Sequence, residues 1–176
     1  HSRQVDSTNR LAVSLAEDEA PEGTLVLTDR QTAGRGRLRR AWHSEPGRSI
    51  AMSLILHPPV SPFRVPELSL VAAIACADAL ERECGVDIRV KWPNDLYIAT
   101  RKIAGILCEM EAELDRLRFL VLGIGINVRS PAGGFPADCA EIATSLEQEG
   151  ARSLHRGRIT LEILDRLEEA YGTWLR

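Results

Sequence analysis

The densest chemical signal in the sequence is a glycine- and arginine-rich stretch between Gln31 and Trp42. Together with Arg30 it holds five of the chain's 22 lysine and arginine residues, arranged around Gly34 and Gly36. Glycine lets the backbone approach a ligand closely, and guanidinium groups hold carboxylate or phosphate oxygens in a two-pronged fork. The stretch therefore predicts a loop that binds a small anion.

The residues after this loop separate it from the phosphate-binding loops that begin a helix. The run Ser49–Leu56 is apolar and typical of a strand, and no Lys-Ser or Lys-Thr pair closes the loop. A loop that cradles phosphate at a helix N-terminus is therefore excluded.

A second chemical segment is Lys91-Trp92-Pro93-Asn94-Asp95. The alternating pattern of a strand over 87–92 stops at Pro93, which cannot continue a hydrogen-bonded ladder. Because the strand ends there, Asn94 and Asp95 are expected in a turn, where their amide and carboxylate groups could contact a ligand. Taken alone, these are also ordinary turn residues, so a purely structural role is the alternative.

Two further strand-like runs carry a lysine and a pair of glycines. Lys102 stands at the start of an apolar run, where a solvated lysine at the sheet edge is as reasonable as a ligand contact. In 121–128 the two-residue period of a strand places Gly123, Gly125 and Asn127 on one face. Two missing side chains leave room for a close approach, and a bulge is the structural alternative.

The rest of the sequence alternates between helical and strand-like periods, which predicts a single α/β or α+β domain that holds these residues. Asp6, Ser7 and Thr8 are candidate caps for the first helix. We expect helices over 9–19, 66–84 and 160–175, a short helix over 141–148, a loop over 130–138, and strands over 24–29, 49–56, 87–92, 103–110 and 118–128.

Composition limits the kind of protein. The chain has 176 residues, 44% of them hydrophobic, which is enough for one domain with a core. A net charge of -3 argues against general attraction to nucleic acid. No run reaches the ~18 residues of a membrane span and no signal peptide is recognisable, so we expect no membrane partner and a cytoplasmic location.

The cysteines and histidines predict neither a metal site nor a nucleophile. Cys76, Cys84 and Cys108 lie in apolar surroundings typical of core residues. Cys139 lies in a loop, where we expect an inert thiol and a nucleophile is the alternative. The four histidines show no metal-ligand spacing, so no zinc site is expected.

Taken together, the segments resemble the biotin protein ligases, also called biotin-[acetyl-CoA-carboxylase] ligases, over nearly the whole chain. Five matches occur in the family's order and approximate spacing: Asp6-Ser7-Thr8-Asn9, Gln31 to Trp42, Lys91 to Asp95, Lys102 to Leu107, and Gly123 to Asn127. The resemblance implies a catalytic domain related to class II aminoacyl-tRNA synthetases, with an α+β fold in two layers whose mixed sheet is flanked by helices. We expect residues 1–176 to form this domain, without the N-terminal helix-turn-helix or the C-terminal SH3-like β-barrel of some relatives.

The resemblance implies an ATP-dependent reaction in two halves. Biotin is activated to biotinyl-5'-AMP with release of pyrophosphate, and biotin then passes to a lysine of a biotin carboxyl carrier domain. ATP with Mg²⁺ is the implied cosubstrate, the metal being held through the ATP phosphates without an identified protein ligand. Apart from the resemblance, pairing of exposed sheet edges would permit a homodimer.

Residue roles carry over position by position. Implied catalytic residues are Lys102, Arg37 and Asp95. Implied biotin contacts are Ser7, Thr8, Asn9, Gln31, Gly34, Arg35, Gly36, Arg37, Lys102 and Gly105. Implied nucleotide contacts are Arg37, Trp42, Asn94, Lys102 and Asn127. The alternative role of Trp42 is structural, namely to anchor the end of the loop in the core.

One departure and two rival functions stand beside this interpretation. Arg39 occupies the position where many relatives have a third glycine, so the loop could be stiffer. The first rival is a lipoate or octanoate ligase or transferase, which resembles the biotin protein ligases in fold. A non-catalytic biotin sensor would bind the ligand without turnover.

Overall fold

The computed structural model describes residues 1–176, apart from the side chain of Arg39. A seven-stranded sheet with the order β1-β2-β3-β7-β6-β5-β4 forms its centre. The first pair, β1 and β2, is parallel and the other neighbouring pairs are antiparallel, so the sheet is mixed. The strands are β1 (Ser2–Val5), β2 (Leu25–Gln31), β3 (Ser49–Leu56), β4 (Arg89–Lys91), β5 (Asp95–Ile98), β6 (Arg101–Glu113) and β7 (Arg116–Asn127).

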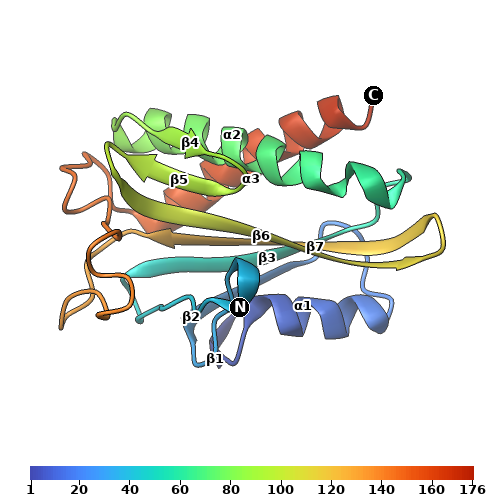
Figure 1. Cartoon of the computed structure of the whole chain (residues 1–176), viewed down its shortest axis with the longest axis horizontal. Coiled ribbons are helices and arrows are strands. Elements are labelled where there is room, and N and C mark those ends of the chain that lie inside the picture. Colours follow the sequence, from blue (N-terminus) through green and yellow to red (C-terminus); the bar gives the residue numbers. More distant parts are fainter.

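Helices cover both faces of the sheet (Figure 1). The long helices α2 (Val65–Cys84) and α3 (Arg156–Trp174) pack against each other on one face, and α1 (Thr8–Glu17) lies on the other. Two short 3₁₀ helices, η1 (Arg37–Arg39) and η2 (Pro62–Arg64), interrupt the connections. None of the described helices combines the length and the hydropathy needed to cross a membrane.

The buried side chains explain this layering. The larger core cluster joins α2 and α3 to the sheet through residues such as Leu68, Leu122 and Ile163, and a smaller cluster joins α1 to the opposite face through Ala12 and Val121. Because β7 is covered on both faces, it is apolar almost continuously rather than in alternation. The central strands β3, β7 and β6 therefore form a rigid platform for residues at their ends.

The α+β class with a mixed sheet flanked by helices is confirmed. The expected helices 9–19, 66–84 and 160–175 appear with shifted ends, and the strand 49–56 is placed as predicted. The expected strand 87–92 shortens to Arg89–Lys91, while β1 and β5, of four residues each, were not expected.

The predicted short helix over 141–148 is wrong, because this segment forms turns. Beside local turn bonds, such as that from the Ala143 N–H to the Cys139 carbonyl (2.8 Å), two of its N–H groups bond to distant strands. The N–H of Thr144 donates to the carbonyl of Lys102 (2.9 Å), and the N–H of Leu146 donates to the carbonyl of Asn127 (3.0 Å). These tertiary bonds hold the segment against the ends of β6 and β7.

Candidate active site

A cavity of about 690 Å³ opens beside the ends of β2, β6 and β7. Its walls come from the start of α1, the arginine loop (residues 31–42), the turn before β5 and the segment 135–143. The structure brings nearly all of the predicted site residues to this cavity: Ser7, Thr8, Asn9, Gln31, Arg35, Gly36, Arg37, Trp42, Asn94, Asp95, Lys102, Gly105 and Asn127. Segments far apart in the sequence thus form one site.

The glycines of β7 are explained by close approach and not by a bulge. The register of β7 with both β3 and β6 is regular across Gly123 and Gly125. A Cβ on Gly123 would overlap Asn9 Oδ1 and lie 2.8 Å from Asn9 Cγ, and a Cβ on Gly125 would lie 2.7 Å from Trp42 Cζ2. Each missing side chain therefore admits a residue that lines the cavity.

A buried network of hydroxyl and amide groups forms one end of the cavity. Gln31 Oε1 accepts bonds from the Thr8 N–H (2.8 Å) and the Thr8 hydroxyl (3.1 Å). The Ser53 hydroxyl lies 2.8 Å from Thr8 Oγ1 and 2.6 Å from Asn9 Oδ1, and its single proton can serve one of them at a time. Asn9 Nδ2 donates to Glu109 Oε2 (2.8 Å). These contacts fix the groups that face the ligand space.

Ser7 occupies the N-cap position of α1, yet its side chain makes no capping hydrogen bond to the described residues. Of the three candidate caps, Ser7 is thus the N-cap residue by position, without a capping bond from its side chain. The side chain is buried and lines the cavity. Its hydroxyl is consequently available to a ligand.

Ser53 supports this network from β3, and replacing it with alanine tests its contribution. We expect Ser53→Ala to destabilise the fold by about 1–3 kcal/mol, because removal of a buried donor leaves its partner unsatisfied. Biotin affinity should fall with it, since Thr8 and Asn9 lose a shared anchor. Urea unfolding and biotin titration measure the two effects, and Ser14→Ala, on the exposed side of α1, is the matched control. A free energy of unfolding within about 0.5 kcal/mol of the wild type would contradict the structural role.

Lys102 provides a fixed positive charge beside the network. Its Nζ lies 2.6 Å from Asp95 Oδ1, and both side chains are about a quarter exposed (25% and 26%). A Cβ on Gly105 would lie 3.2 Å from this Nζ and 3.5 Å from Asp95 Oδ1, so the glycine makes room for the ion pair. The backbone of Lys102 is also fixed, because its N–H donates to the Ile142 carbonyl (2.7 Å).

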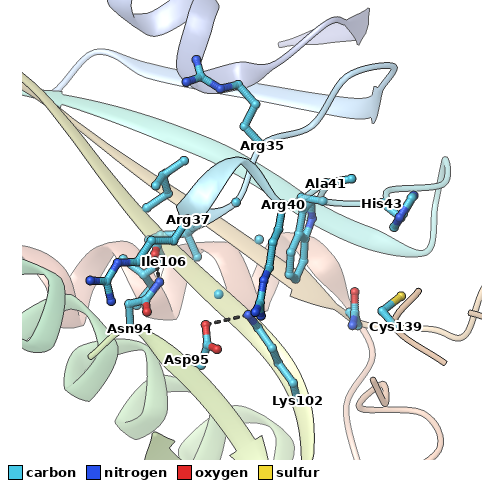
Figure 2. A pocket seen from close by; sticks show the side chains of 18 of the residues that line it. Arg35, Arg37, Arg40, Ala41, His43, Asn94, Asp95, Lys102, Ile106 and Cys139 are labelled. Atoms are coloured by element: carbon cyan, nitrogen blue, oxygen red, sulfur yellow. Dashed lines mark hydrogen bonds and ion pairs between the residues drawn. The ribbon is translucent and has the colours of Figure 1, made fainter. Parts of the chain in front are cut away.

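The arginine loop presents its side chains in different directions (Figure 2). Arg35 points away from Lys102 and pairs with Glu109 Oε1 (2.9 Å). The side chain of Arg40 extends toward Lys102, whereas that of Arg37 points toward Asn94. The loop is closed by bonds from the Gly36 N–H to the Arg40 carbonyl (2.8 Å) and from the Trp42 N–H to the Gly34 carbonyl (2.9 Å). Arg40 lines the cavity but was not among the predicted site residues.

Gly34 is the one predicted contact that does not line this cavity. A Cβ there would overlap the Trp42 carbonyl oxygen and lie 2.9 Å from Gln31 Nε2. The glycine therefore allows the two ends of the loop to meet, and its predicted direct contact with the ligand is not supported by the geometry.

The amide residues and Trp42 frame the other end of the cavity. Asn94 Nδ2 donates to the Ile106 carbonyl (2.6 Å), and Asn127 Nδ2 donates to the Thr144 carbonyl (3.0 Å). Trp42 lies over Gly125, with Lys102 Nζ 6.0 Å from its ring centroid. Its Nε1 is buried without a hydrogen-bond partner among the described side chains and backbone. Trp42 therefore anchors the end of the loop and carries an unused donor, and its contact with a nucleotide stays a prediction.

The cysteines have the properties of inert thiols. Burial raises the pKa of Cys76 to about 12 and contributes most to the rise of Cys84 and Cys108 to about 11. Burial, followed by the neighbouring Asp138 carboxylate, also raises the pKa of Cys139. Since the thiolate is the nucleophilic form, these four thiols are poorly suited to nucleophilic attack at neutral pH.

The mixed sheet thus carries a cavity that is lined by the two glycines of β7 and by the Lys102–Asp95 pair. The sequence model of the Biotin/lipoate A/B protein ligase family matches residues 1–127. The chain belongs to this family.

Individual relatives agree with this placement. The chain is 44% identical over 171 residues to the bifunctional ligase/repressor BirA of Bacillus subtilis, covering 97% of this chain and 53% of the relative. It is 34% identical to the biotin–[acetyl-CoA-carboxylase] ligase of Paracoccus denitrificans, covering 97% and 70%. The chain thus spans about half the length of BirA.

Solved structures show the same fold. The biotin protein ligase of Aquifex aeolicus in complex with biotin and ATP matches with a TM-score of 0.78 at 33% identity, covering 96% of this chain and 67% of the other. The Leishmania major biotin protein ligase in complex with biotinyl-5-AMP also gives 0.78, at 26% identity, covering 99% and 75%.

Proposed function

We propose that this chain is the catalytic domain of an ATP-dependent biotin protein ligase acting in the cytoplasm. It activates biotin to biotinyl-5'-AMP and transfers biotin to a lysine of a carboxylase carrier domain. The observation that carries the proposal is the fixed Lys102–Asp95 pair, placed between a buried amide network and the arginine loop. Four free cysteines suit a reducing compartment.

The amide and hydroxyl network favours biotin over lipoate. The ureido ring of biotin has N–H donors and a carbonyl acceptor, which Ser7, Thr8, Asn9 and Gln31 can match. The dithiolane ring of lipoate has no N–H and only weak sulfur acceptors. It would leave these buried polar groups unpaired, and such a mismatch discriminates strongly between ligands.

Adenylate formation requires two anions to meet. A carboxylate oxygen of biotin attacks the α-phosphorus of ATP, and pyrophosphate leaves with the electrons of the broken P–O bond. Lys102 and Arg37 lower the mutual repulsion of the two anions by preorganised positive charge in a partly dry cavity. Biotin itself is the nucleophile, so no enzyme nucleophile is needed.

In the second half, the amine of the carrier lysine attacks the acyl carbon and AMP leaves. The amine must lose a proton in this step. Asp95 is the carboxylate nearest to Lys102 in the cavity, and we assign it to orient the incoming amine. Asn94, Asn127 and Trp42 are assigned to the nucleotide end.

Mg²⁺ belongs with ATP as part of the substrate. The metal prefers six oxygen ligands and retains several waters. Waters and nucleotide phosphates can therefore supply most of its ligands. Asp95 is paired with Lys102. Among the described residues, one group of three His, Cys, Asp or Glu donors lies close enough to share an ion; it consists of His43, Asp138 and Cys139 and has one oxygen donor. No protein-held magnesium step is therefore assigned.

Pyrophosphate release distinguishes the proposed reaction from its rivals. With ATP and Mg²⁺, biotin should support release, whereas lipoate and octanoate should not. A transferase would need a reactive thiolate, which the raised pKa values of the cysteines disfavour. Labelling of a carrier-domain lysine would exclude a non-catalytic sensor, and lipoate-dependent release equal to that with biotin would contradict the assignment.

Replacing Arg37 tests the arginine loop. We expect Arg37→Ala to speed the escape of biotinyl-5'-AMP about 10-fold to 100-fold, since a hydrogen bond to a charged group contributes ~1.5–3 kcal/mol. Stability should change by less than about 0.5 kcal/mol, because the side chain is exposed. Rapid filtration of preformed adenylate measures the escape. Arg3→Ala, on the exposed side of β1, is the control, and a large loss of stability would show that Arg37 is structural.

A further inference from the structure

Three side chains that could bind a metal meet at the edge of the cavity, and the proposed ligase reaction uses none of them. His43 follows the arginine loop, whereas Asp138 and Cys139 lie in the segment after β7. One donor atom from each lies within 4.8 Å of the others, and His43 Nε2 is 3.2 Å from Asp138 Oδ2. Figure 2 shows His43 and Cys139 on the same side of the cavity, away from Arg35 and Arg37.

The backbone fixes both donor-bearing segments. On one side of His43 the Trp42 N–H donates to the Gly34 carbonyl (2.9 Å), and on the other side the Ser44 hydroxyl accepts from the Gln31 N–H (2.8 Å). The Cys139 N–H donates to the Pro136 carbonyl (2.9 Å), and the Cys139 carbonyl accepts from the Ala143 N–H (2.8 Å). Because both segments are held, the three donors need only small side-chain movements to converge on one ion.

We propose that His43, Asp138 and Cys139 bind a zinc-class transition-metal ion. Imidazole nitrogen, thiolate sulfur and carboxylate oxygen are the three donor types that zinc accepts, and three protein ligands leave its fourth position open. Mg²⁺ and Ca²⁺ require mostly oxygen ligands, and only Asp138 supplies one. On binding, the Cys139 thiol releases its proton to solvent and the sulfur coordinates the ion.

The bound ion joins two walls of the cavity. His43 adjoins Trp42, which lies over Gly125, and the segment of Cys139 continues to Ile142, whose carbonyl accepts the Lys102 N–H. A metal ion at this point links the end of the arginine loop to the backbone beside Lys102. Its predicted effect is to stabilise the chain and restrain the loop end.

Cobalt titration of the chain tests the site without relying on ligase activity. Co²⁺ should give a near-ultraviolet sulfur-to-metal charge-transfer band, and Zn²⁺, but not excess Mg²⁺, should abolish it. Zn²⁺ should also raise the unfolding temperature, since a ligand that binds only the folded state stabilises it. The absence of the band in the wild type would overturn the proposal.

Variants locate the ion. Cys139→Ala should lose the band, and His43→Ala should weaken Co²⁺ binding by at least about tenfold, because losing a ligand costs no less than losing a residue that only supports one. His43→Cys should retain binding, because zinc-class ions accept sulfur at that position. Cys108→Ser is the matched cysteine control and should keep the band. If the band survives in Cys139→Ala, or is lost in Cys108→Ser, the ion binds elsewhere and the assignment is wrong; failure of His43→Cys to bind would likewise contradict it.

Discussion

Lys102→Ala should slow the formation of biotinyl-5'-AMP by about 100-fold or more, the scale of losing one preorganised electrostatic stabiliser. The side chain is three-quarters buried and is fixed by Asp95 and by its backbone bond to Ile142. Its charge therefore needs little reorganisation when the carboxylate and the α-phosphate approach. Single-turnover formation of the adenylate is the measurement.

Lys91→Ala is the matched control, because Lys91 is the other lysine of the chain and lies in β4 outside the cavity lining. It should leave the rate of adenylate formation unchanged. In Lys102→Ala the affinity for biotin should fall by a smaller factor than the rate of adenylate formation. The reason is that the proposed stabilisation by the Lys102 charge is strongest at the transition state. Equal rates in the wild type and Lys102→Ala would remove the lysine from the reaction.

Gly123→Ala should weaken biotin binding by about tenfold to a hundredfold, or ~1.4–2.8 kcal/mol. The added Cβ would overlap Asn9 Oδ1 and lie 2.8 Å from Asn9 Cγ, so Asn9 must move. That movement breaks its bonds to Ser53 and Glu109 and turns it away from the ligand space. Calorimetric titration with biotin measures the loss.

The control for this change is Gly133→Ala, where an added Cβ would meet no described atom within 4 Å. Its biotin affinity should equal that of the wild type. An unchanged affinity in Gly123→Ala would show that Asn9 does not position the biotin ring.

The main elements of the fold were accessible from the sequence because their patterns are long. The helical period of 66–84 and the apolar run of β3 persist over many residues, and tertiary contacts agree with them. The four-residue strands β1 and β5 are too short to show a pattern. The segment 141–148 was assigned incorrectly because the N–H groups of Thr144 and Leu146 donate to Lys102 of β6 and Asn127 of β7, which a helix would not allow.

The candidate site was predictable where chemistry and local pattern coincide. Lys102, Asp95 and the glycines of β7 stand in recognisable segments, and the structure places them at one cavity. The sequence could not show what each glycine makes room for: Gly123 and Gly125 admit the side chains of Asn9 and Trp42. Gly34 instead allows the two ends of its own loop to meet.

The three metal donors illustrate the same limit more strongly. His43 and Asp138 are 95 residues apart and lie in irregular segments. Metal-ligand spacing in the sequence detects donors that share a turn or a helix, whereas this cluster depends on the packing of two loops. The expectation of no zinc site followed from that limitation, and the proposed site departs from it.

A single-turnover experiment with this chain, biotin and MgATP tests the central claim most directly. Mass spectrometry of the quenched mixture should detect biotinyl-5'-AMP at close to one equivalent per chain, together with pyrophosphate. The absence of biotinyl-5'-AMP at saturating biotin and ATP would contradict the account.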